Sequence, residues 1–403
     1  MNVLFLTLLS FESLSERSIY TDLLREFVKN GHIVYAISPM EKREKIKTHR
    51  VSENNATILR LQTGNTQKTN IIEKGISTVL IEPAYRKAIK DYFSDVKFDL
   101  ILYTTPPVTL VSAIEYVKKR DGAKTYLLLK DIFPQNAVDM GMMRADGWKG
   151  MLYRHFRKQE KKLYEVSDCI GCMSQANVNY ILRHNPDVRP DKVEVCPNSI
   201  EVIDKSVDDE TRMRIRNKYG VPPDKKIFVY GGNLGKPQGI PFLIDCLKEC
   251  GNLNGVFFLI VGDGTDFRLI DQYLQTEKPR NVKLMKRLPK EEYDTLVGAC
   301  DVGMIFLDHR FTIPNFPSRL LTYMQAKLPV LAVTDPNTDI GRVIAEGNFG
   351  WWCESNDAKG FRKTVETAIS ADDTLLRNNS FAYLNEQYSV EQSIRTIQRR
   401  MKQ

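Results

Sequence analysis

The sequence predicts an α/β protein made of two doubly wound, parallel-sheet domains. Three observations predict it: the length of the chain, an alternation of apolar strand-like runs with helical stripes, and a polar interruption after which the alternation restarts. The chain has 403 residues, of which 42% are hydrophobic and 27% charged. Hydrophobic cores stop growing at about 250–300 residues, so two domains of roughly 200 residues are expected, with a cleft between them.

The first domain begins with a strand, a helix and a second strand. Residues 3–8 form a continuous apolar run, which is typical of a strand covered on both faces. Apolar residues between 19 and 28 then fall on one helical stripe, Gly31 stands where a left-handed helix end belongs, and residues 33–37 return to a strand pattern. This βαβ unit predicts a parallel sheet.

The alternation continues and then restarts after a polar segment. Strands are expected at residues 100–103 and 125–129, with a helix from about 108 to 118 between them, and the pattern runs to about residue 196. Residues 204–226 are polar and contain two consecutive prolines, which indicates an interdomain connection with a short helix. The second domain shows the strand pattern at residues 227–230, 256–261, 302–307 and 330–333.

The end of the chain is predicted to be a helix. Ile394, Ile397 and Met401 form the apolar side of a basic helix over residues 390–401. The expected division is therefore a first domain at residues 1–203, a second domain at residues 204–385 and a terminal helical segment at residues 386–403. The family resemblance given below implies that this segment returns to the first domain.

Composition bounds the class of protein. Lysine plus arginine (58) exceeds aspartate plus glutamate (50), and the resulting formal charge of +8 favours anionic partners without naming one. Residues 1–9 are apolar but lack the basic segment of a secretory signal, and no apolar run approaches the ~20 residues that span a bilayer. Seven cysteines without regular spacing fit a reducing compartment. These features lead us to expect a cytoplasmic protein.

A glycine-rich segment, residues 231–239, follows the first strand of the second domain. Its glycines allow a ligand to approach the backbone closely, and the helix that follows offers free N–H groups to an anion. The spacing matches neither a Walker loop nor a dinucleotide-binding fingerprint. We interpret the segment as a phosphate site, the alternative being a plain turn; its candidate contacts are Gly232, Asn233, Gly235 and Lys236.

A second anion-ready segment, residues 311–319, precedes a predicted helix over 320–326. Two prolines stiffen it, Ser318 is suited to cap the helix, and Arg319 stands beside the cap. Asn315 and these two residues are candidate phosphate contacts, although a capped helix alone would also explain the pattern. Two such segments in one domain indicate a diphosphate.

Five motifs in order carry a family resemblance. They are Gly31-His32, residues 196–201 (CPNSIE), residues 233–239 (NLGKPQG), residues 262–264 (GDG) and residues 323–330 (YMQAKLPV). The order and spacing of these motifs resemble those of the family-4 retaining nucleotide-sugar glycosyltransferases. The resemblance covers essentially the whole chain. The chain is most similar to the bacterial subgroup that builds capsule and O-antigen repeat units, often from N-acetylated amino or deoxyamino sugars.

The resemblance implies a GT-B architecture, in which two Rossmann-like domains face each other across a cleft. It places a UDP-sugar donor on the second domain and the acceptor on the first. It also implies that no metal and no cofactor are needed, because helix N-termini and basic side chains neutralise the departing diphosphate.

The chain departs from the family pattern at four positions. The usual Arg and Lys of the first phosphate segment are replaced by Asn233 and Gln238, so Lys236 is expected to substitute for them. The two usual glutamates are replaced by Pro314 and Thr322. The candidates for the nucleoside are then Thr322 itself, which retains one hydroxyl for the ribose, with Gly262 and Arg287.

Lys130 and Asp131 follow a strand of the first domain and are the catalytic candidates. The subgroup places a basic residue followed by Asp here, which implies that Asp131 orients the acceptor hydroxyl or takes its proton. The alternatives are a surface Asp in a turn, and a front-side mechanism in which the departing phosphate takes the proton and Asp131 only positions groups.

Residues 140–162 interleave apolar and basic side chains. Met140, Met142, Met143, Trp148, Met151, Leu152 and Phe156 lie among Lys149, Arg154, Arg157, Lys158, Lys161 and Lys162. This pattern is typical of an interfacial membrane segment, and the alternative is an ordinary amphipathic helix. The subgroup's acceptor is usually a polyprenyl-diphosphate-linked sugar, so we expect peripheral attachment to anionic lipid at the inner membrane face. Nucleic acid is not expected, because no fold or aromatic platform for it is present.

The leading hypothesis is therefore a retaining transferase that moves a sugar from a UDP-sugar to a lipid-linked or oligosaccharide acceptor in surface polysaccharide biosynthesis. A catalytically silent, glycosyltransferase-like scaffold at the membrane is an alternative, because the usual glutamates, Arg and Lys are missing. A nucleotide-sugar epimerase of the same architecture is a third hypothesis.

Overall fold

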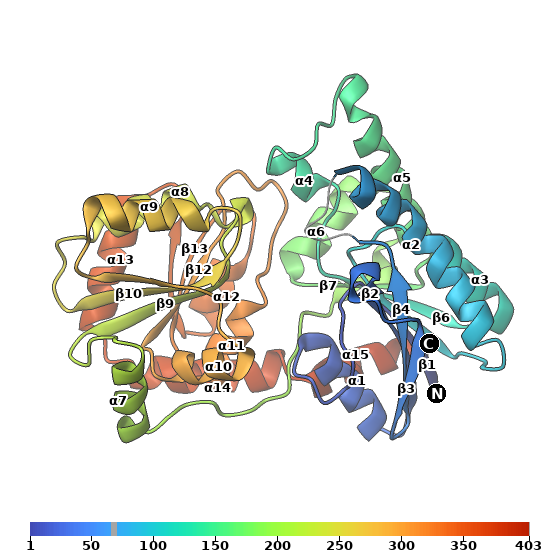
Figure 1. Ribbon diagram of the computed structural model, residues 1–403, viewed down its shortest axis with the longest axis horizontal. Helices are drawn as coiled ribbons and strands as arrows, with labels where there is room; N and C mark the ends of the chain where they lie inside the picture. The colour runs from blue at the N-terminus through green and yellow to red at the C-terminus, as the bar shows by residue number, and fades with distance from the viewer. Residues whose placement is uncertain (66–70, 403) are drawn as a thin grey trace. The chain divides into compact units, whose positions relative to one another are not determined.

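The computed structural model describes residues 1–65 and 71–402, which form two compact units (Figure 1). Unit 1 comprises Met1–Glu201 together with residues 390–402, and unit 2 comprises Val202–Ser389. The chain therefore leaves unit 1 once and returns to it for its last helix. Among the described residues, no helix is both long enough and apolar enough to cross a membrane.

Unit 1 is built on a sheet of eight described strands in the order β3-β4-β2-β1-β5-β6-β7-β8. All neighbours pair in parallel except β3 and β4, which are antiparallel and were not expected from the sequence. The strands are β1 Asn2–Leu6, β2 Ile33–Glu41, β3 His49–Glu53, β4 Ala56–Thr63, β5 Leu100–Thr104, β6 Lys124–Leu129, β7 Cys169–Cys172 and β8 Val193–Val195.

Helices cover both faces of this sheet. They are α1 Ile19–Lys29, α2 Ile71–Tyr92, α3 Val111–Asp121, α4 Gln135–Asp139, α5 Met151–Val166, α6 Gln175–His184 and α15 Val390–Met401, with short 3₁₀ turns η1 Lys42–Glu44, η2 Trp148–Gly150 and η3 Pro190–Lys192. Ser18 caps α1 by accepting from the Thr21 N–H at 3.1 Å, which satisfies a free donor of its first turn. Figure 1 shows α1 and α15 together on one face and α2 and α3 on the other.

The terminal helix α15 is part of the core of unit 1. Val390, Ile394 and Ile397 are buried in one cluster with Leu24 and Phe27 of α1. The expected apolar side of this helix is therefore the side that packs, and burial of each such aliphatic side chain contributes about 1.5–3 kcal/mol.

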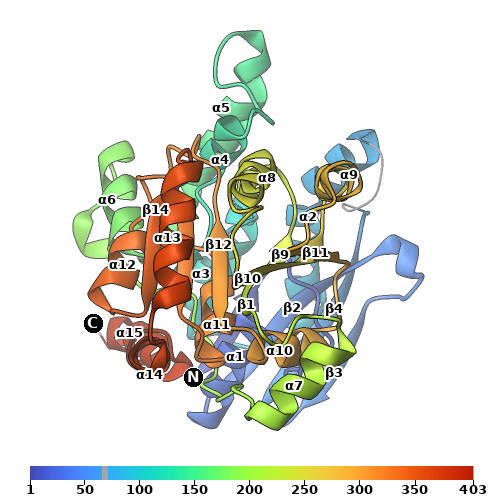
Figure 2. The ribbon, with the colours of Figure 1, turned by 90° about the vertical axis from the view of Figure 1, so that its left-hand side faces the viewer.

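Unit 2 is built on a fully parallel sheet of six described strands in the order β11-β10-β9-β12-β13-β14. The strands are β9 Lys226–Asn233, β10 Val256–Asp263, β11 Val282–Met285, β12 Val302–Phe306, β13 Val330–Thr334 and β14 Gly350–Glu354. The helices are α7 Asp209–Lys218, α8 Ile240–Glu249, α9 Phe267–Glu277, α10 Lys290–Gly298, α11 Arg319–Gln325, α12 Ile340–Glu346, α13 Ala358–Ser370 and α14 Thr374–Gln387, with the 3₁₀ turn η4 Lys236–Gln238. One sheet face packs against α8, α9 and α13 (Figure 2).

Two strands of unit 2 extend beyond the apolar runs that predicted them. We expected β9 to end at Tyr230 and β10 at Val261, but each continues for two or more residues, because Gly232 pairs with Gly262 and Asn233 with Asp263. A side chain at Gly262 would place its Cβ 2.0 Å from the Gly232 carbonyl oxygen, so the close pairing requires glycine there. The glycines expected to open a loop therefore first finish a strand.

The helix expected from about residue 108 begins three residues later. Val108 and Leu110 are buried, which accounts for the apolar pattern, but α3 starts only at Val111. Apolar spacing alone does not separate a buried approach segment from the first helical turn.

Candidate functional site

The two anion-ready segments of unit 2 meet at the point where its strand order reverses. In open parallel sheets, ligands bind at the carboxyl ends of the strands, at this reversal. Here the reversal lies between β9 and β12, and the residues after these strands are in contact: the Asp308 N–H donates to the Pro237 carbonyl at 3.0 Å. Gly239, at φ +60°, lies so close that an added Cβ would be 3.3 Å from Asp308 Cα.

Hydrogen bonds within the glycine-rich segment and to the end of β9 hold it in a turn. Asn233 Nδ2 donates to Gln238 Oε1 at 2.9 Å, so the two residues that replace the family's Arg and Lys bind each other. The Tyr230 hydroxyl donates to the Asn233 carbonyl at 2.7 Å. Gly235 is buried, whereas Lys236 is exposed and has no ion-pair partner among the described residues. Lys236 is therefore an exposed cation beside a hydrogen-bonded turn.

Arg319 lies beside the end of β9. Its Nη2 would be 3.5 Å from a Cβ added to Gly232, and its guanidinium carbon is 4.5 Å from the centre of the Tyr230 ring. Its Nη1 atom is enclosed and has no hydrogen-bond partner. No carboxylate among the described residues forms an ion pair with Arg319, although arginine stays charged in proteins.

This arrangement has an electrostatic consequence. A buried charge is costly unless it is paired and hydrogen-bonded, and a donor that is enclosed without an acceptor adds to that cost. A phosphate at the carboxyl end of β9 would supply both the negative charge and the acceptor oxygens. Arg319 is therefore suited to bind an anion, and the exposed Gly232 leaves backbone space for that anion.

The segment that precedes Arg319 is held by the turn after β13. Thr338 Oγ1 donates to the Asn315 carbonyl at 2.5 Å, and Asn337 Nδ2 donates to the Phe311 carbonyl at 2.6 Å. Asp335 Oδ1 in turn accepts from the backbone N–H of both residues of this turn, at 2.9 and 3.2 Å. Burial raises the pKa of Asp335 to about 6, and its Oδ2 has no partner.

Ser318 does not cap the helix as expected. It has helical backbone angles, φ −65° and ψ −15°, its side chain makes no cap hydrogen bond, and it is exposed. A capping residue needs extended angles to turn its oxygen back onto the helix, so Ser318 already continues the turn instead.

The nucleoside candidates occupy three separate elements. Gly262 lies at the end of β10 and pairs with Gly232, so it serves the close pairing of the strands as well as any ligand. Thr322 is half-buried on α11, one turn after Arg319. Arg287 is exposed after β11, two strands away from β9 in the sheet.

Four residues of this site are missed by reasoning from the sequence. Tyr230, Tyr293 and Tyr323 surround Arg319, and Asp335 anchors the turn after β13. The tyrosines come from three elements and no spacing relates them. A polar residue directly after an apolar run, as at Asp335, is a signal that was present in the sequence.

The catalytic candidates of unit 1 lie together after β6. The Thr105 hydroxyl accepts from the backbone N–H of Lys130 at 3.0 Å and of Asp131 at 3.3 Å, which ties them to the end of neighbouring β5. The strand order of unit 1 reverses between β5 and β1, so this pair lies one strand from the reversal. Lys130 Nζ also donates to the Cys196 carbonyl at 3.5 Å.

Burial shifts both titratable groups toward neutral pH. It lowers the pKa of Lys130 to about 8 and raises the pKa of Asp131 to about 6. The two side chains form no ion pair with each other. Pairs of titratable groups whose pKa values approach the working pH are typical of general acid–base sites.

The basic and apolar segment 140–162 divides into a buried and an exposed part. Met140 is buried, and Phe156 packs edge to face against Phe133 with ring centres 5.0 Å apart. Both residues therefore contribute to internal packing, whereas we expected them on an outer surface. Four apolar side chains remain largely exposed: Met142 (61%), Trp148 (78%), Met151 (67%) and Leu152 (54%). The side chain of Lys149 lies outside the described residues. Figure 2 shows the stretch before α5 extending from the rest of its unit.

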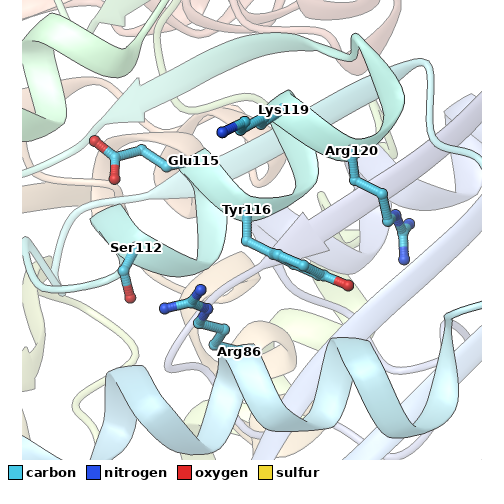
Figure 3. A pocket seen from close by; sticks show the side chains of 6 residues that line it. All are labelled: Arg86, Ser112, Glu115, Tyr116, Lys119 and Arg120. Carbon is cyan, nitrogen blue, oxygen red and sulfur yellow. The ribbon is translucent and has the colours of Figure 1, made fainter.

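A shallow pocket lies between α2 and α3 (Figure 3). Arg86 and Arg120 both lie over the Tyr116 ring, at 5.6 and 5.7 Å, and Arg120 also pairs with Asp121. These cations are engaged in joining the two helices. None of the predicted site residues lines this pocket.

Comparison with known proteins places these features in context. Residues 211–383 match the family model of glycosyl transferases group 1. The chain is 24% identical over 325 residues to the probable glycosyltransferase WbjE of Pseudomonas aeruginosa, covering 80% of this chain and 78% of WbjE. It is 24% identical over 251 residues to the putative colanic acid biosynthesis glycosyl transferase WcaI of Escherichia coli K12, covering 61% and 60%.

The fold is shared with solved structures. HepE of Anabaena in complex with UDP superposes with a TM-score of 0.68 at 15% identity, over the whole of both chains. The class of protein that the fold defines is therefore GT-B, an α/β architecture of two Rossmann-like units, as expected. Residues 211–383, most of unit 2, are the part that resembles the group 1 glycosyl transferases.

Proposed function

We propose that this protein is a retaining, family-4 glycosyltransferase that moves a sugar from a UDP-sugar to a lipid-linked or oligosaccharide acceptor in surface polysaccharide biosynthesis. The observation that carries the proposal is Arg319, an enclosed cation without a carboxylate at the carboxyl end of β9. The group 1 domain and the similarity to WbjE and WcaI support transferase chemistry, and the UDP held by the same fold in HepE supports a uridine nucleotide.

In the proposed reaction, the bond from the anomeric carbon of the sugar to the diphosphate breaks and a bond to the acceptor oxygen forms on the same face. Arg319, Lys236 and the backbone of Gly232 stabilise the negative charge that develops on UDP, so no metal is required. Asn315 and Ser318 lie in the segment leading to Arg319 and complete the diphosphate site, while Thr322, Gly262 and Arg287 are assigned to the nucleoside.

Asp131 is assigned to the acceptor. Its carboxylate orients the acceptor hydroxyl, whose proton goes to Asp131 or to the departing phosphate, and Lys130 supplies positive charge beside it. The pKa of Asp131, about 6, leaves the group mostly ionised at neutral pH, which suits this role. For the donor we favour an N-acetylated amino or deoxyamino sugar, on the subgroup resemblance.

We further propose a polyprenyl-diphosphate-linked acceptor and peripheral attachment to anionic lipid at the cytoplasmic face of the inner membrane. The exposed Met142, Trp148, Met151 and Leu152 support it, because exposed apolar side chains beside cations are what an interfacial segment presents. Lys158 and Lys161, which are exposed on α5, supply such cations.

The test is a panel of UDP-sugars incubated with the purified chain and a polyprenyl-diphosphate-linked sugar, with release of UDP as the readout. We expect release with one class of donor, and a loss of about 100-fold or more in Lys236→Ala/Arg319→Met. The control is Lys363→Ala, an exposed lysine on α13. No release with any donor and no binding of UDP would favour the silent scaffold, and a changed sugar still attached to nucleotide would favour the epimerase.

A further inference from the structure

Arg319 is surrounded by three tyrosines and by no carboxylate. Tyr230 presents its ring to the guanidinium at 4.5 Å, and both Tyr293 and Tyr323 lie close enough to interact with it electrostatically. An ion pair would also hold an arginine in place, but it would cancel the charge that a ligand needs. An aromatic face attracts the cation through its quadrupole and leaves the net charge intact.

The tyrosines are themselves fixed by the backbone of the site. The Tyr230 hydroxyl donates to the Asn233 carbonyl at 2.7 Å. The Tyr323 hydroxyl donates to the Met304 carbonyl at 3.0 Å and accepts from the Gly231 N–H at 3.2 Å, so it joins β12 to β9 across the strand reversal.

Tyr293 completes the enclosure from α10. A Cβ added to Gly231 would lie 1.6 Å from the Tyr293 hydroxyl oxygen, so this hydroxyl occupies the place of a side chain at the end of β9. The pKa of Tyr293 is raised well above its usual value, first by burial and then by Tyr323 beside it, so the phenol stays neutral and does not act as a counter-ion.

We propose that the ring of Tyr230 is a positioning residue for the donor diphosphate, acting through Arg319. Tyr230 holds the guanidinium next to Gly232 by a cation–π contact, and Tyr293 and Tyr323 exclude other partners, so that the diphosphate becomes the counter-ion of Arg319. This inference rests on the proposed function. It adds a role to a residue that contacts no substrate.

The proposal predicts that the ring matters and the hydroxyl matters less. Tyr230→Phe keeps the aromatic face and Tyr230→Leu removes it. Titration calorimetry with UDP and with uridine separates the diphosphate from the nucleoside, because only UDP carries phosphate. We expect Tyr230→Leu to lower the ratio of UDP affinity to uridine affinity by about tenfold, and Tyr230→Phe to keep it within about threefold of wild type.

The control is Phe228→Leu, which trims another buried aromatic residue of β9 that packs in the same core. A purely structural role for Tyr230 predicts that Tyr230→Leu and Phe228→Leu both lower the melting temperature and leave the affinity ratio unchanged, and that result would overturn the proposal. If wild type binds UDP no better than uridine, the proposed function fails instead, so the two failures are distinguishable.

Discussion

Arg319 is the residue on which the proposed diphosphate site depends most. Its charge is enclosed, its Nη1 lacks an acceptor, and its neighbours are aromatic. Charged groups in such costly surroundings cluster at functional sites, which makes Arg319 a candidate for binding an anion. The sequence indicates Gly232 from its place after a strand and Arg319 from its place beside a predicted helix cap. It could not select Tyr230 or Tyr293, because the order of strands and helices, and not spacing, brings them to Arg319. Tyr323 lies four residues after Arg319 on α11, a spacing that the sequence does show.

The first prediction concerns stability without ligand. Arg319 is half-buried, and its enclosed Nη1 has no hydrogen-bond partner, so an apolar side chain of similar volume removes a desolvation cost from the ligand-free chain. Arg319→Met is therefore expected to leave the free energy of unfolding unchanged or to raise it by up to about 2 kcal/mol, as measured by urea titration of the ligand-free chain. A loss of more than about 2 kcal/mol would show that Arg319 is a structural residue and not a site for an anion.

The second prediction concerns the pH dependence of activity. Asp131, with a pKa of about 6, is ionised above that pH, and Lys130, with a pKa of about 8, is charged below that pH. Transfer is expected to rise as pH increases through about 6 and to fall as it increases through about 8. Asp131→Asn should remove the acid limb and Lys130→Met the alkaline limb, each with a large loss of rate. A profile that keeps both limbs in both variants contradicts these roles.

Among the secondary-structure elements, the turn after β13 holds the proposed phosphate-binding segment, residues 311–319, in place. Residues 335–338 hold the segment before Arg319 by side-chain to backbone hydrogen bonds. The hydrophobic pattern located β13 and α11, but it did not show that the turn between β13 and α12 supports a different loop. Periodicity also placed the ends of β9 and β10 too early, since glycine pairing leaves no apolar signal.

The third prediction follows from the pKa of Asp335, which burial raises from 3.8 to about 6. The folded state binds this proton more tightly than the unfolded chain does. Proton binding by Asp335 therefore adds about 3 kcal/mol to the free energy of unfolding below pH 3.8. This contribution is lost as the pH rises from 3.8 to about 6. Relative to Asp335→Asn, wild type should lose unfolding free energy over this range in urea titrations. Asp224→Asn, at an exposed position, is the control, and parallel curves for wild type and Asp335→Asn would refute the argument.

The fourth prediction concerns the segment before α5. Trp148→Ser/Met151→Ser removes two exposed apolar side chains without touching a core cluster. Co-sedimentation with phosphatidylglycerol vesicles is expected to weaken by about tenfold, whereas Leu375→Ser, an exposed apolar residue of unit 2, should bind as wild type does. Equal binding by the Trp148/Met151 variant and the control would remove the membrane assignment, and the transferase proposal would stand without it.

At the scale of the whole molecule, the chain completes unit 1 only with its last helix. Length and alternation predicted two doubly wound units, and the apolar stripe of residues 390–401 predicted a terminal helix, because these are properties of long segments. The return of that helix was implied by the family resemblance. The antiparallel strand β3 was not predicted, because this short edge strand is largely exposed and shows little apolar pattern.

The fifth prediction tests this completion. Ile397 is fully buried between α15 and the sheet of unit 1, so Ile397→Ala is expected to cost about 2–5 kcal/mol of unfolding free energy. Leu375→Ala, at a position that is 60% exposed, should change it by less than about 0.5 kcal/mol. A negligible effect at Ile397 would mean that α15 is not part of the folded core of unit 1.

The proposed contact between Arg319 and the diphosphate of a uridine nucleotide can be measured by itself. Calorimetric titration of UDP into wild type and into Arg319→Met tests it most directly, with uridine as the phosphate-free reference. We predict that wild type binds UDP more tightly than uridine and that Arg319→Met loses about 100-fold in UDP affinity while its affinity for uridine stays the same. Equal UDP affinity in the two proteins would show that Arg319 does not bind the diphosphate.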